Sequence, residues 1–301
     1  MKILITGGTG LLGRALIETS GRRCGITATY LDKCPPKDTP AVKYRKLDIR
    51  DREGYDRLFR ELRPSVVVHT AGVGSPDHAE KHKKESREIN VGGTANIVAN
   101  CERYGAKFIY ISSNGIYDGK SAPYREDDKA KPINFYGKIK LEGEKVAKKT
   151  GVPHAIVRPI LMYGWNNPSS RPNIVTFALS KLRKGEKVHV YDDVYVNPLF
   201  VQSCADAIWK IVKDERYDTF NIAGKERVSI YGLIQKAARI FGFDPGLVMP
   251  VQQGFFNEMA KRPSDTSYHT GKMRAVLGIK PLSVTEGLKL MKNLKKASGN
   301  G

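Results

Sequence analysis

A glycine-rich turn directly follows the first β-like run of the chain, and it constrains the fold more than any other feature. The run Lys2–Thr6 passes at once into Gly7-Gly8-Thr9-Gly10-Leu11-Leu12-Gly13. Glycines between a strand and a helix permit a tight turn, close approach of a pyrophosphate and close helix–strand packing. N–H groups at the helix start, near Leu11 and Leu12, can then face phosphates. The glycines at Gly7, Gly10 and Gly13 therefore predict a dinucleotide-binding unit, with a purely structural turn as the alternative.

Short β-branched runs alternate with helical stretches through the first half of the chain. We expect strands at Lys2–Thr6, Ile26–Leu31, Ser65–Thr70, Lys107–Ser112 and His154–Arg158. Between them we expect helices at Leu11–Ser20, Asp51–Leu62, Ser86–Tyr104 and Phe135–Lys149. This pattern predicts an α/β fold, a Rossmann-like doubly wound parallel sheet, with ligands at the edge where the carboxyl ends of the strands meet.

The alternation loosens after Tyr163-Gly164, where a loop of turn-forming residues runs from Trp165 to Pro172. We expect residues 1–164 to form the dinucleotide-binding domain, joined by a return segment at about 196–225. A smaller C-terminal substrate-binding lobe would comprise residues 165–195 and 226–301. Its expected elements and those of the return segment are Thr176–Lys184, Ser203–Lys213, Thr219–Ile222, Tyr231–Phe241 closed by Gly242, and a frayed tail at Lys295–Gly301.

Composition is typical of a soluble globular protein, with 40% hydrophobic and 27% charged residues. No apolar run approaches the roughly 20 residues that cross a bilayer, and the N-terminus lacks the long apolar stretch and cleavage site of a signal peptide. We therefore expect a cytoplasmic protein without a membrane partner.

The net charge of +20, from 51 Lys and Arg against 31 Asp and Glu, suggests an anionic partner. Basic residues recur along the whole chain, however, and no zinc-finger or RNA-binding aromatic signature accompanies them. Nucleic-acid binding is therefore disfavoured, whereas a positive surface would attract a substrate that carries a diphosphate.

The cysteines are Cys24, Cys34, Cys101 and Cys204, scattered without Cys-x-x-Cys spacing. This spacing supports neither a metal site nor a disulfide framework, so we expect reduced, mostly inert thiols and no metal.

A carboxylate that follows the second expected strand bears on the choice of cofactor. Asp32 lies about 20 residues after the glycines, where it would accept hydrogen bonds from a ribose and repel a 2′-phosphate. This favours NAD over NADP, although the ammonium of Lys33 could neutralise that phosphate.

Two further pairs of residues are candidates for cofactor binding. Asp48-Ile49 could flank the adenine, although a helix N-cap ahead of Asp51 explains Asp48 almost as well. Ala71-Gly72 lies just beyond an expected strand and is small enough for a ribose to approach.

Tyr136 and Lys140 lie four residues apart on an expected helix, and Ser113 ends a neighbouring strand. A tyrosine ionises near pH 10, so it exchanges a proton at neutral pH only if its anion is stabilised. Lys140, one turn along the helix, would supply positive charge, and Ser113 could polarise a substrate carbonyl. In isolation the pair would be a half-buried tyrosine beside a solvated lysine; beside a cofactor turn, it predicts a hydride-transfer site.

Several longer segments carry a resemblance to a known family. They are Thr6–Gly13, Phe108–Gly119, Pro123–Asp128, Pro132–Glu144, and Lys261–Ser267 followed by Leu277-Gly278. On these segments the chain resembles the extended short-chain dehydrogenase/reductases. Within them it is similar to the dTDP-4-dehydrorhamnose reductases and to the related regulatory β-subunit of methionine adenosyltransferase.

The resemblance implies a Rossmann-like domain, an NAD(P)(H) cofactor, and Tyr136 as the acid/base, with Lys140 lowering its pKa and Ser113 as the third member. It also implies that Asn90 braces the active site from the adjoining helix. The remaining implied site residues are Arg158 and Pro159 near the cofactor, and Trp165 and Arg262 as substrate contacts in the lobe that holds the nucleotide part of a sugar nucleotide.

One departure from the family pattern leaves the substrate open. Where the reductases commonly carry Thr-Asp-Tyr, this chain has Ser113-Asn114-Gly115. Asn114 can hydrogen-bond a substrate but cannot donate a proton as an acid, which also speaks against the dehydratase branch.

Three functions remain open at this point. The first is an NAD(P)H-dependent reductase of a 4-keto nucleotide sugar. The second is a nucleotide-sugar epimerase or dehydrogenase that keeps its NAD bound, and the third is a non-catalytic regulatory subunit that binds cofactor and a partner enzyme. The fold alone does not decide among them, and a homodimer is compatible with each.

Overall fold

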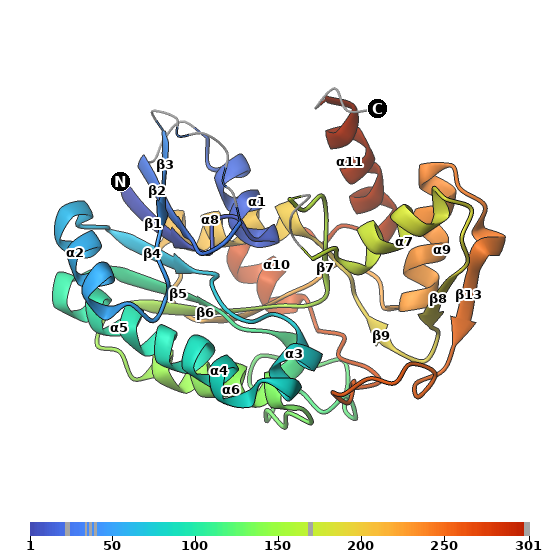
Figure 1. The fold of residues 1–301 in the computed structure, drawn as a ribbon, viewed down its shortest axis with the longest axis horizontal. Helices are drawn as coiled ribbons and strands as arrows, with labels where there is room; N and C mark the ends of the chain where they lie inside the picture. The colour runs from blue at the N-terminus through green and yellow to red at the C-terminus, as the bar shows by residue number, and fades with distance from the viewer. Residues whose placement is uncertain (22–24, 34, 36–37, 39–40, 168–170, 298–301) are drawn as a thin grey trace.

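A seven-stranded parallel sheet forms the centre of the computed structural model (Figure 1), which describes residues 1–21, 25–33, 35, 38, 41–167 and 171–297. The order of its strands is β11-β6-β5-β4-β1-β2-β3. The strands are β1 (Lys2–Thr6), β2 (Gly25–Tyr30), β3 (Val42–Lys46), β4 (Val66–His69), β5 (Lys107–Ile111), β6 (His154–Pro159) and β11 (Thr219–Ile222). The chain runs outward from β1 in both directions, so the carboxyl ends of β1 and β4 flank the crevice where such sheets bind ligands.

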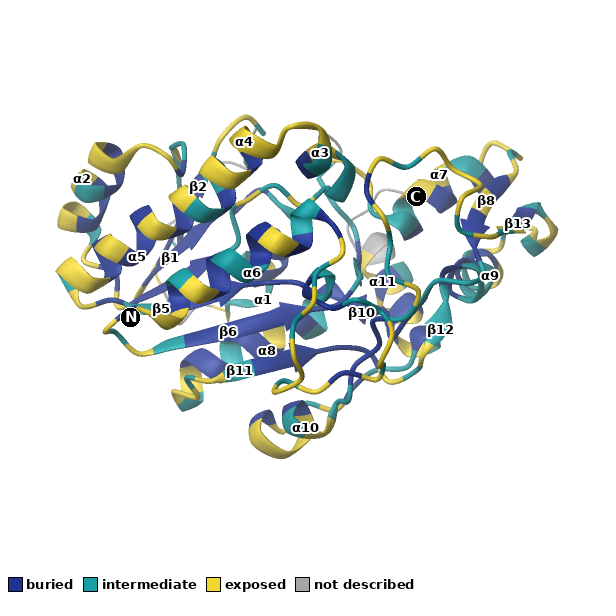
Figure 2. Ribbon diagram, turned by 90° about the horizontal axis from the view of Figure 1, so that it is seen from below, coloured by how far each residue is buried: buried dark blue, intermediate teal, exposed yellow. Residues whose placement is uncertain are grey.

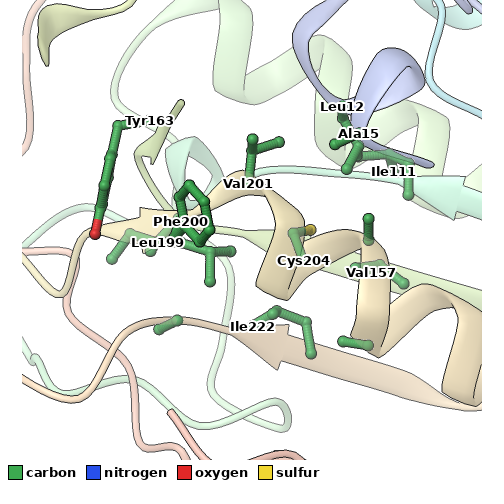
Figure 3. Close-up of a cluster of buried hydrophobic side chains, with 14 of the residues drawn as sticks. Leu12, Ala15, Ile111, Val157, Tyr163, Leu199, Phe200, Val201, Cys204 and Ile222 are labelled. Carbon is green, nitrogen blue, oxygen red and sulfur yellow. The ribbon is translucent and has the colours of Figure 1, made fainter. Parts of the chain in front are cut away.

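Alternating side chains of β1 enter two separate cores, one on each face of the sheet. Ile3 and Ile5 pack with α1 (Leu11–Thr19) and α8 (Val201–Asp214), whereas Leu4 packs with α2 (Arg52–Leu62) and α5 (Gly93–Tyr104). Figure 3 shows the first core, where Leu12 and Ala15 of α1 approach Ile111, Val157 and Cys204. Because both faces are covered, the strands are buried along most of their length, as Figure 2 shows for β6 and β11, and they are mainly apolar, with buried polar residues such as His69 and Arg158 among them.

The helical stretch before β5 is divided into several pieces. It comprises α3 (Pro76–Lys81), α4 (Lys83–Arg87), a π-helical turn η2 (Glu88–Gly92) and then α5. The expected continuous helix Ser86–Tyr104 is therefore interrupted, and π turns of this kind often occur at functional sites. The helix α6 (Phe135–Lys148) follows β5 and packs beside α5 on the same face of the sheet (Figure 1).

The C-terminal part of the chain builds a second, smaller group of elements beside the sheet. Its main elements are α7 (Ile174–Leu182), β8 (Val188–Tyr191), α9 (Ile230–Phe241), β13 (Val248–Val251) and α11 (Val284–Ala297). Smaller ones are β7 (Met162–Tyr163), β9 (Tyr195–Val196), β10 (Leu199–Phe200), β12 (Val228–Ser229), α10 (Gly271–Leu277), η3 (Asn114–Ile116) and η4 (Pro245–Leu247). In Figure 1, α7, α9, β8 and β13 lie together at one end of the molecule, away from β1–β5.

Three elements after residue 195 return to the central sheet. α8 packs against α1 and β6, and β11 pairs with β6. α10 packs against β11, where Lys272 lies over the Phe220 ring at 5.1 Å. Part of the expected lobe, residues 271–277, therefore lies against the central sheet.

The expected frayed tail, Lys295–Gly301, is helical in its described part. Lys295–Ala297 continue α11, so the prediction of a frayed tail is wrong for these residues. Residues 298–301 lie outside the described part of the chain, and so do residues 168–170 of the loop after Trp165. The buried side chains Leu288 and Met291 hold α11 against the protein and extend the helix beyond the point expected from composition.

Cys101 and Cys204 are free and buried, and burial raises the pKa of both thiols. Cys24 and Cys34 lie outside the described residues. Within the described ranges, none of the helices combines the length and the hydropathy that crossing a membrane requires.

Candidate active site

The glycine turn after β1 is a cradle that side chains would fill. Gly7 has φ +71°, which favours glycine, and a Cβ there would lie 2.9 Å from the backbone of Ala71. A Cβ on Gly8 would meet Ala28 at 2.6 Å, and one on Gly13 would meet the Gly7 carbonyl oxygen at 2.3 Å. The helix α1 begins after Gly10 without a side-chain cap. The residues present fit a pyrophosphate, whose binding at this turn stays a prediction.

A chain of hydrogen bonds lies beneath this cradle. The Ala71 amide donates to Thr6 Oγ1 over 3.2 Å, and Thr6 Oγ1 lies 2.7 Å from His69 Nδ1. On the other side, His69 Nε2 lies 3.0 Å from Thr94 Oγ1, which donates to the Asn90 carbonyl. Because the Thr94 proton is engaged, Nε2 carries the imidazole proton and Nδ1 accepts from Thr6. Burial, aided by repulsion from Lys140, lowers the pKa of His69 to about 3, so the ring is neutral.

Asn90, in the π turn η2, holds the loop that follows β4. Its Oδ1 accepts from the Val73 amide over 2.7 Å, and its Nδ2 donates to the Val73 carbonyl over 3.0 Å. A Cβ on Gly72 would lie 2.9 Å from Asn90 Oδ1, so glycine is needed for this approach. The bracing that the resemblance implies for Asn90 therefore acts on residues 72–73.

The other predicted cofactor residues have different surroundings. Asp32 is exposed and Lys33 half-buried, both directly after β2. Hydrogen bonds from Arg50 engage the Asp48 carboxylate and hold its pKa below its usual range. The alternative role of Asp48 as a helix cap is wrong, because Asp51 caps α2 by accepting from the Gly54 amide over 2.9 Å. Ile49 is buried, and a Cβ on Gly93 would contact it at 2.7 Å.

Ser113 and Tyr136 come together where β5 ends and α6 begins. A Cβ on Gly115 would lie 3.2 Å from the Tyr136 ring and 3.5 Å from Ser113 Oγ. Burial raises the pKa of the Tyr136 phenol, and its hydrogen bond with Ser113 opposes that shift. Tyr136 is therefore a neutral phenol near pH 7, the form that donates a proton.

Lys140 is buried one turn further along α6, not solvated. Its Nζ donates to the Ile111 carbonyl over 3.0 Å and lies 5.4 Å from the centre of the Tyr110 ring. Burial lowers the pKa of Lys140 to about 8, against the attraction of Glu144. Its ammonium is thus anchored on β5, one helical turn from Tyr136.

Both polar atoms of the Asn114 side chain are engaged within the protein. Its Oδ1 accepts from Ser113 Oγ over 3.3 Å, and its Nδ2 donates to Thr266 Oγ1 over 2.7 Å. Thr266 belongs to residues 260–266, which also approach α6 where Asn134 Nδ2 donates to the Lys261 carbonyl over 2.8 Å. Asn114 thus links the end of β5 to the C-terminal segment.

The two lobe residues predicted to bind substrate differ in their contacts. Arg262 pairs with Asp77 of α3 at 2.5 Å and with Glu258 at 3.3 Å, and its Nη1 is buried with no hydrogen-bond partner among the described residues. Trp165 donates from Nε1 to the Met291 carbonyl over 2.7 Å and packs edge-on against Phe241. Nη1 of Arg262 is therefore a donor that a ligand could engage, whereas Trp165 packs within the protein.

The Arg158 side chain lies in a buried cluster of hydrogen bonds. Its Nε and Nη2 donate to the Glu144 carboxylate over 2.8 and 2.7 Å, and its Nη1 donates to Tyr117 Oη and the Glu126 carbonyl. The guanidinium of Arg158 is thus committed to a buried ion pair, and its implied place near the cofactor stays a prediction. Pro159 ends β6 beside β11.

The family model described as RmlD substrate binding domain matches residues 1–296. The chain belongs to this family. Methionine adenosyltransferase 2 subunit beta of Bos taurus is 28% identical over 257 residues, 83% of this chain and 75% of that protein.

Two solved reductases share the fold of this member of the RmlD substrate binding domain family. The dTDP-4-dehydrorhamnose reductase of Clostridium acetobutylicum has a TM-score of 0.86 at 27% identity, covering 98% of this chain and 100% of that one. The Bacillus anthracis dTDP-4-dehydrorhamnose reductase, in complex with NADP, has a TM-score of 0.84 at 25% identity, covering 97% and 99%. The chain is an extended short-chain dehydrogenase/reductase by fold, as the sequence predicts.

Several groups at the site of this family member were not among those predicted. They are Thr6, His69, Asp77, Glu144, Thr266 and Ser112. Glu144 carries a signal in sequence, since it lies four residues after Lys140 and eight after Tyr136, on one helix face. The partners of Thr266 and Asp77 lie far away in sequence and carry no such signal.

Proposed function

We propose that this protein is an NAD(P)H-dependent reductase of a 4-keto nucleotide sugar. The observation that carries the proposal is the meeting of Ser113, Tyr136 and Lys140 at the sheet edge that also bears the glycine cradle. Membership of the RmlD substrate binding domain family and the likeness to two dTDP-4-dehydrorhamnose reductases support it.

The glycine cradle and the loop at Ala71-Gly72 would hold the cofactor, with Gly7, Gly10 and Gly13 facing its pyrophosphate beside the amides of Leu11 and Leu12. When bound, a reduced nicotinamide supplies hydride for the substrate carbonyl carbon. Asp32 favours NAD(H) through the ribose hydroxyls, and Lys33 works against that preference.

Tyr136 is the proton donor in this proposal. Its raised pKa keeps the phenol protonated until the substrate oxygen takes the proton. The Lys140 ammonium then stabilises the resulting phenolate, and the Ser113 hydroxyl hydrogen-bonds the substrate oxygen while it gains negative charge.

The C-terminal lobe would bind the nucleotide part of the substrate. Buried polar atoms without partners among the described residues gather on its loops, namely Asp193 Oδ1, Gln253 Nε2 and Arg262 Nη1. Such atoms are costly unless a ligand or water satisfies them. Arg262 would bind a phosphate, Asn114 would contact the sugar once substrate displaces a present partner, and Trp165 would support the lobe next to its loop.

Mixing the purified protein with NADH or NADPH and a dTDP- or UDP-linked 4-keto sugar tests the proposal. We expect oxidation of the reduced cofactor in step with formation of the 4-hydroxy sugar. Tyr136→Phe should lower kcat at least 100-fold with cofactor affinity within about twofold. Tyr104→Phe, at the far end of α5, is the matched control and should retain full activity.

A second candidate function is favoured by the likeness to methionine adenosyltransferase 2 subunit beta. In that case the protein would bind cofactor and a methionine adenosyltransferase without reducing a sugar. Absence of turnover with every 4-keto nucleotide sugar, together with a stable complex with that enzyme in analytical ultracentrifugation, would replace the reductase proposal by this one.

A further inference from the structure

Three consecutive residues at the end of β5 meet three successive turns of α6. Tyr136, Lys140 and Glu144 recur every four residues, so they share one face of the helix. Ile111 accepts from Lys140 Nζ over 3.0 Å, Ser112 Oγ donates to Glu144 Oε1 over 2.6 Å, and Ser113 lies beside Tyr136. We call these paired contacts the β5–α6 ladder.

Glu144 is the most enclosed member of the ladder. Its side chain is 1% exposed, and Arg158 binds both carboxylate oxygens, at 2.8 and 2.7 Å. Arg158 is itself fixed by Tyr117 Oη and the Glu126 carbonyl, each at 2.9 Å. The negative charge of Glu144 therefore has a fixed position, one turn beyond Lys140.

A buried ion pair is weak evidence for a purely stabilising role. The cost of removing two charges from water often exceeds their attraction, and apolar residues of similar volume can serve equally well. The position of this pair, on the helix face that bears Tyr136 and Lys140, points instead to an electrostatic role in the site.

The groups that face Lys140 come from three elements. β4 presents His69, which is neutral, and β5 presents the Tyr110 ring and the Ile111 carbonyl. α6 presents Tyr136 and Glu144, and of all these groups only Glu144 carries a charge at neutral pH that opposes the effect of burial on Lys140.

We propose that Glu144 is a positioning residue that keeps Lys140 in its charged form, with Arg158 and Ser112 holding the carboxylate in place. The inference rests on the proposed function in that a charged Lys140 serves the proton donor Tyr136. The carboxylate thus acts on the reaction through Lys140 and touches neither substrate nor cofactor.

NMR titration of protein labelled with ¹³C at lysine Cε tests this inference without substrate or turnover. The Lys140 resonance is assigned by its loss in Lys140→Met. In Glu144→Gln the pKa of Lys140 should fall by about one unit or more, because the opposing charge is gone. The alkaline limb of kcat/KM should move to lower pH by the same amount. A Lys140 pKa that stays within about 0.3 unit of wild type would overturn the inference.

Glu142→Gln is the matched control for the lost charge. Glu142 lies on the same helix and pairs with Arg87 at 3.0 Å at the surface, so this variant should leave the Lys140 pKa unchanged. An equal shift in Glu142→Gln would show a general charge effect and would also overturn the inference.

Glu144→Gln leaves Arg158 buried and unpaired, so that variant can fail to fold. The double variant Glu144→Gln/Arg158→Met then carries the test, since it removes both charges together. Its Lys140 pKa should still fall, because the Glu144 carboxylate opposes the lowering of that pKa. If wild type reduces no keto sugar, the proposed function fails while the titration still decides the role of Glu144.

Discussion

A Cβ atom on Gly13 would lie 2.3 Å from the carbonyl oxygen of Gly7, so the first turn of α1 is packed directly on the end of β1. Gly13→Ala should therefore displace the cradle, lower the free energy of unfolding by about 1–3 kcal/mol and weaken cofactor binding at least tenfold. Urea unfolding and fluorescence titration with NADH and NADPH measure the two effects.

Gly92→Ala provides the control, since a Cβ there has nothing within 4 Å. In a helical turn this change should be neutral or raise stability by up to about 1 kcal/mol. If both variants match wild type in stability and in cofactor affinity, the close packing of Gly13 has no role in the cradle.

The rate should decline on the alkaline side as Lys140 loses its proton. The pKa of Lys140 is lowered to about 8 by burial, so the charged form is lost as pH rises through that value. We expect kcat/KM to fall tenfold per pH unit above it, as measured with saturating cofactor. Lys140→Arg stays charged, so the decline of kcat/KM at alkaline pH should disappear in this variant. An unchanged decline would assign the ionisation to another group.

His69 should make the protein less stable in acid. Its pKa is lowered to about 3 in the folded state against about 6.5 in the unfolded chain, so below pH 6.5 the unfolded state binds the extra proton. The contribution of His69 to the free energy of unfolding is complete above pH 6.5 and decreases as the pH falls, by about 3 kcal/mol at pH 4. Urea unfolding from pH 7 to 4 measures the slope. In His69→Gln the slope of the free energy of unfolding against pH should decrease by the contribution of one proton. An equally steep slope in that variant would contradict the assignment to His69.

Arg262 should affect substrate binding more than folding. Its Nη1 has no partner among the described residues, whereas Nη2 is paired with Asp77. Arg262→Met should raise KM for the nucleotide sugar at least tenfold and leave cofactor Kd within about twofold. Asp77→Asn breaks the same ion pair but keeps the guanidinium, and should change KM much less. Equal changes in KM for the two variants would mean that Arg262 acts only by bracing α3.

The sequence predicts five strands and the main helices of the first half of the chain to within one residue at each end, except around η2. Apolar runs and glycine punctuation are local signals, so they are readable without the fold. The strand β3 was not predicted, because Val-Lys-Tyr-Arg-Lys lies at the sheet edge and carries charged side chains. The π turn at Asn90 likewise has no local signal, since its helix continues on both sides.

The candidate site was predictable where its chemistry is concentrated in short motifs. Tyr136, Lys140 and the glycines fall into this class. The ion pair of Arg158 was not predicted, because its partner Glu144 lies on another element and a strand sequence does not reveal which partner a buried arginine finds. The role of Asn114 as a link to Thr266 depends on a contact across 152 residues of chain.

The β5–α6 ladder and the chain that connects its two sides depend on each other. The ladder contacts hold the spacing of Ser113 and Tyr136, while in the connecting residues 114–134 the buried Tyr117 binds Arg158 through its hydroxyl and Glu126 does so through its carbonyl. Arg158 in turn holds Glu144, so a change of length in the buried part of this connection reaches the ladder. Variation in the connection is therefore expected at its exposed residues 127–129, where it leaves the proton-transfer geometry in place.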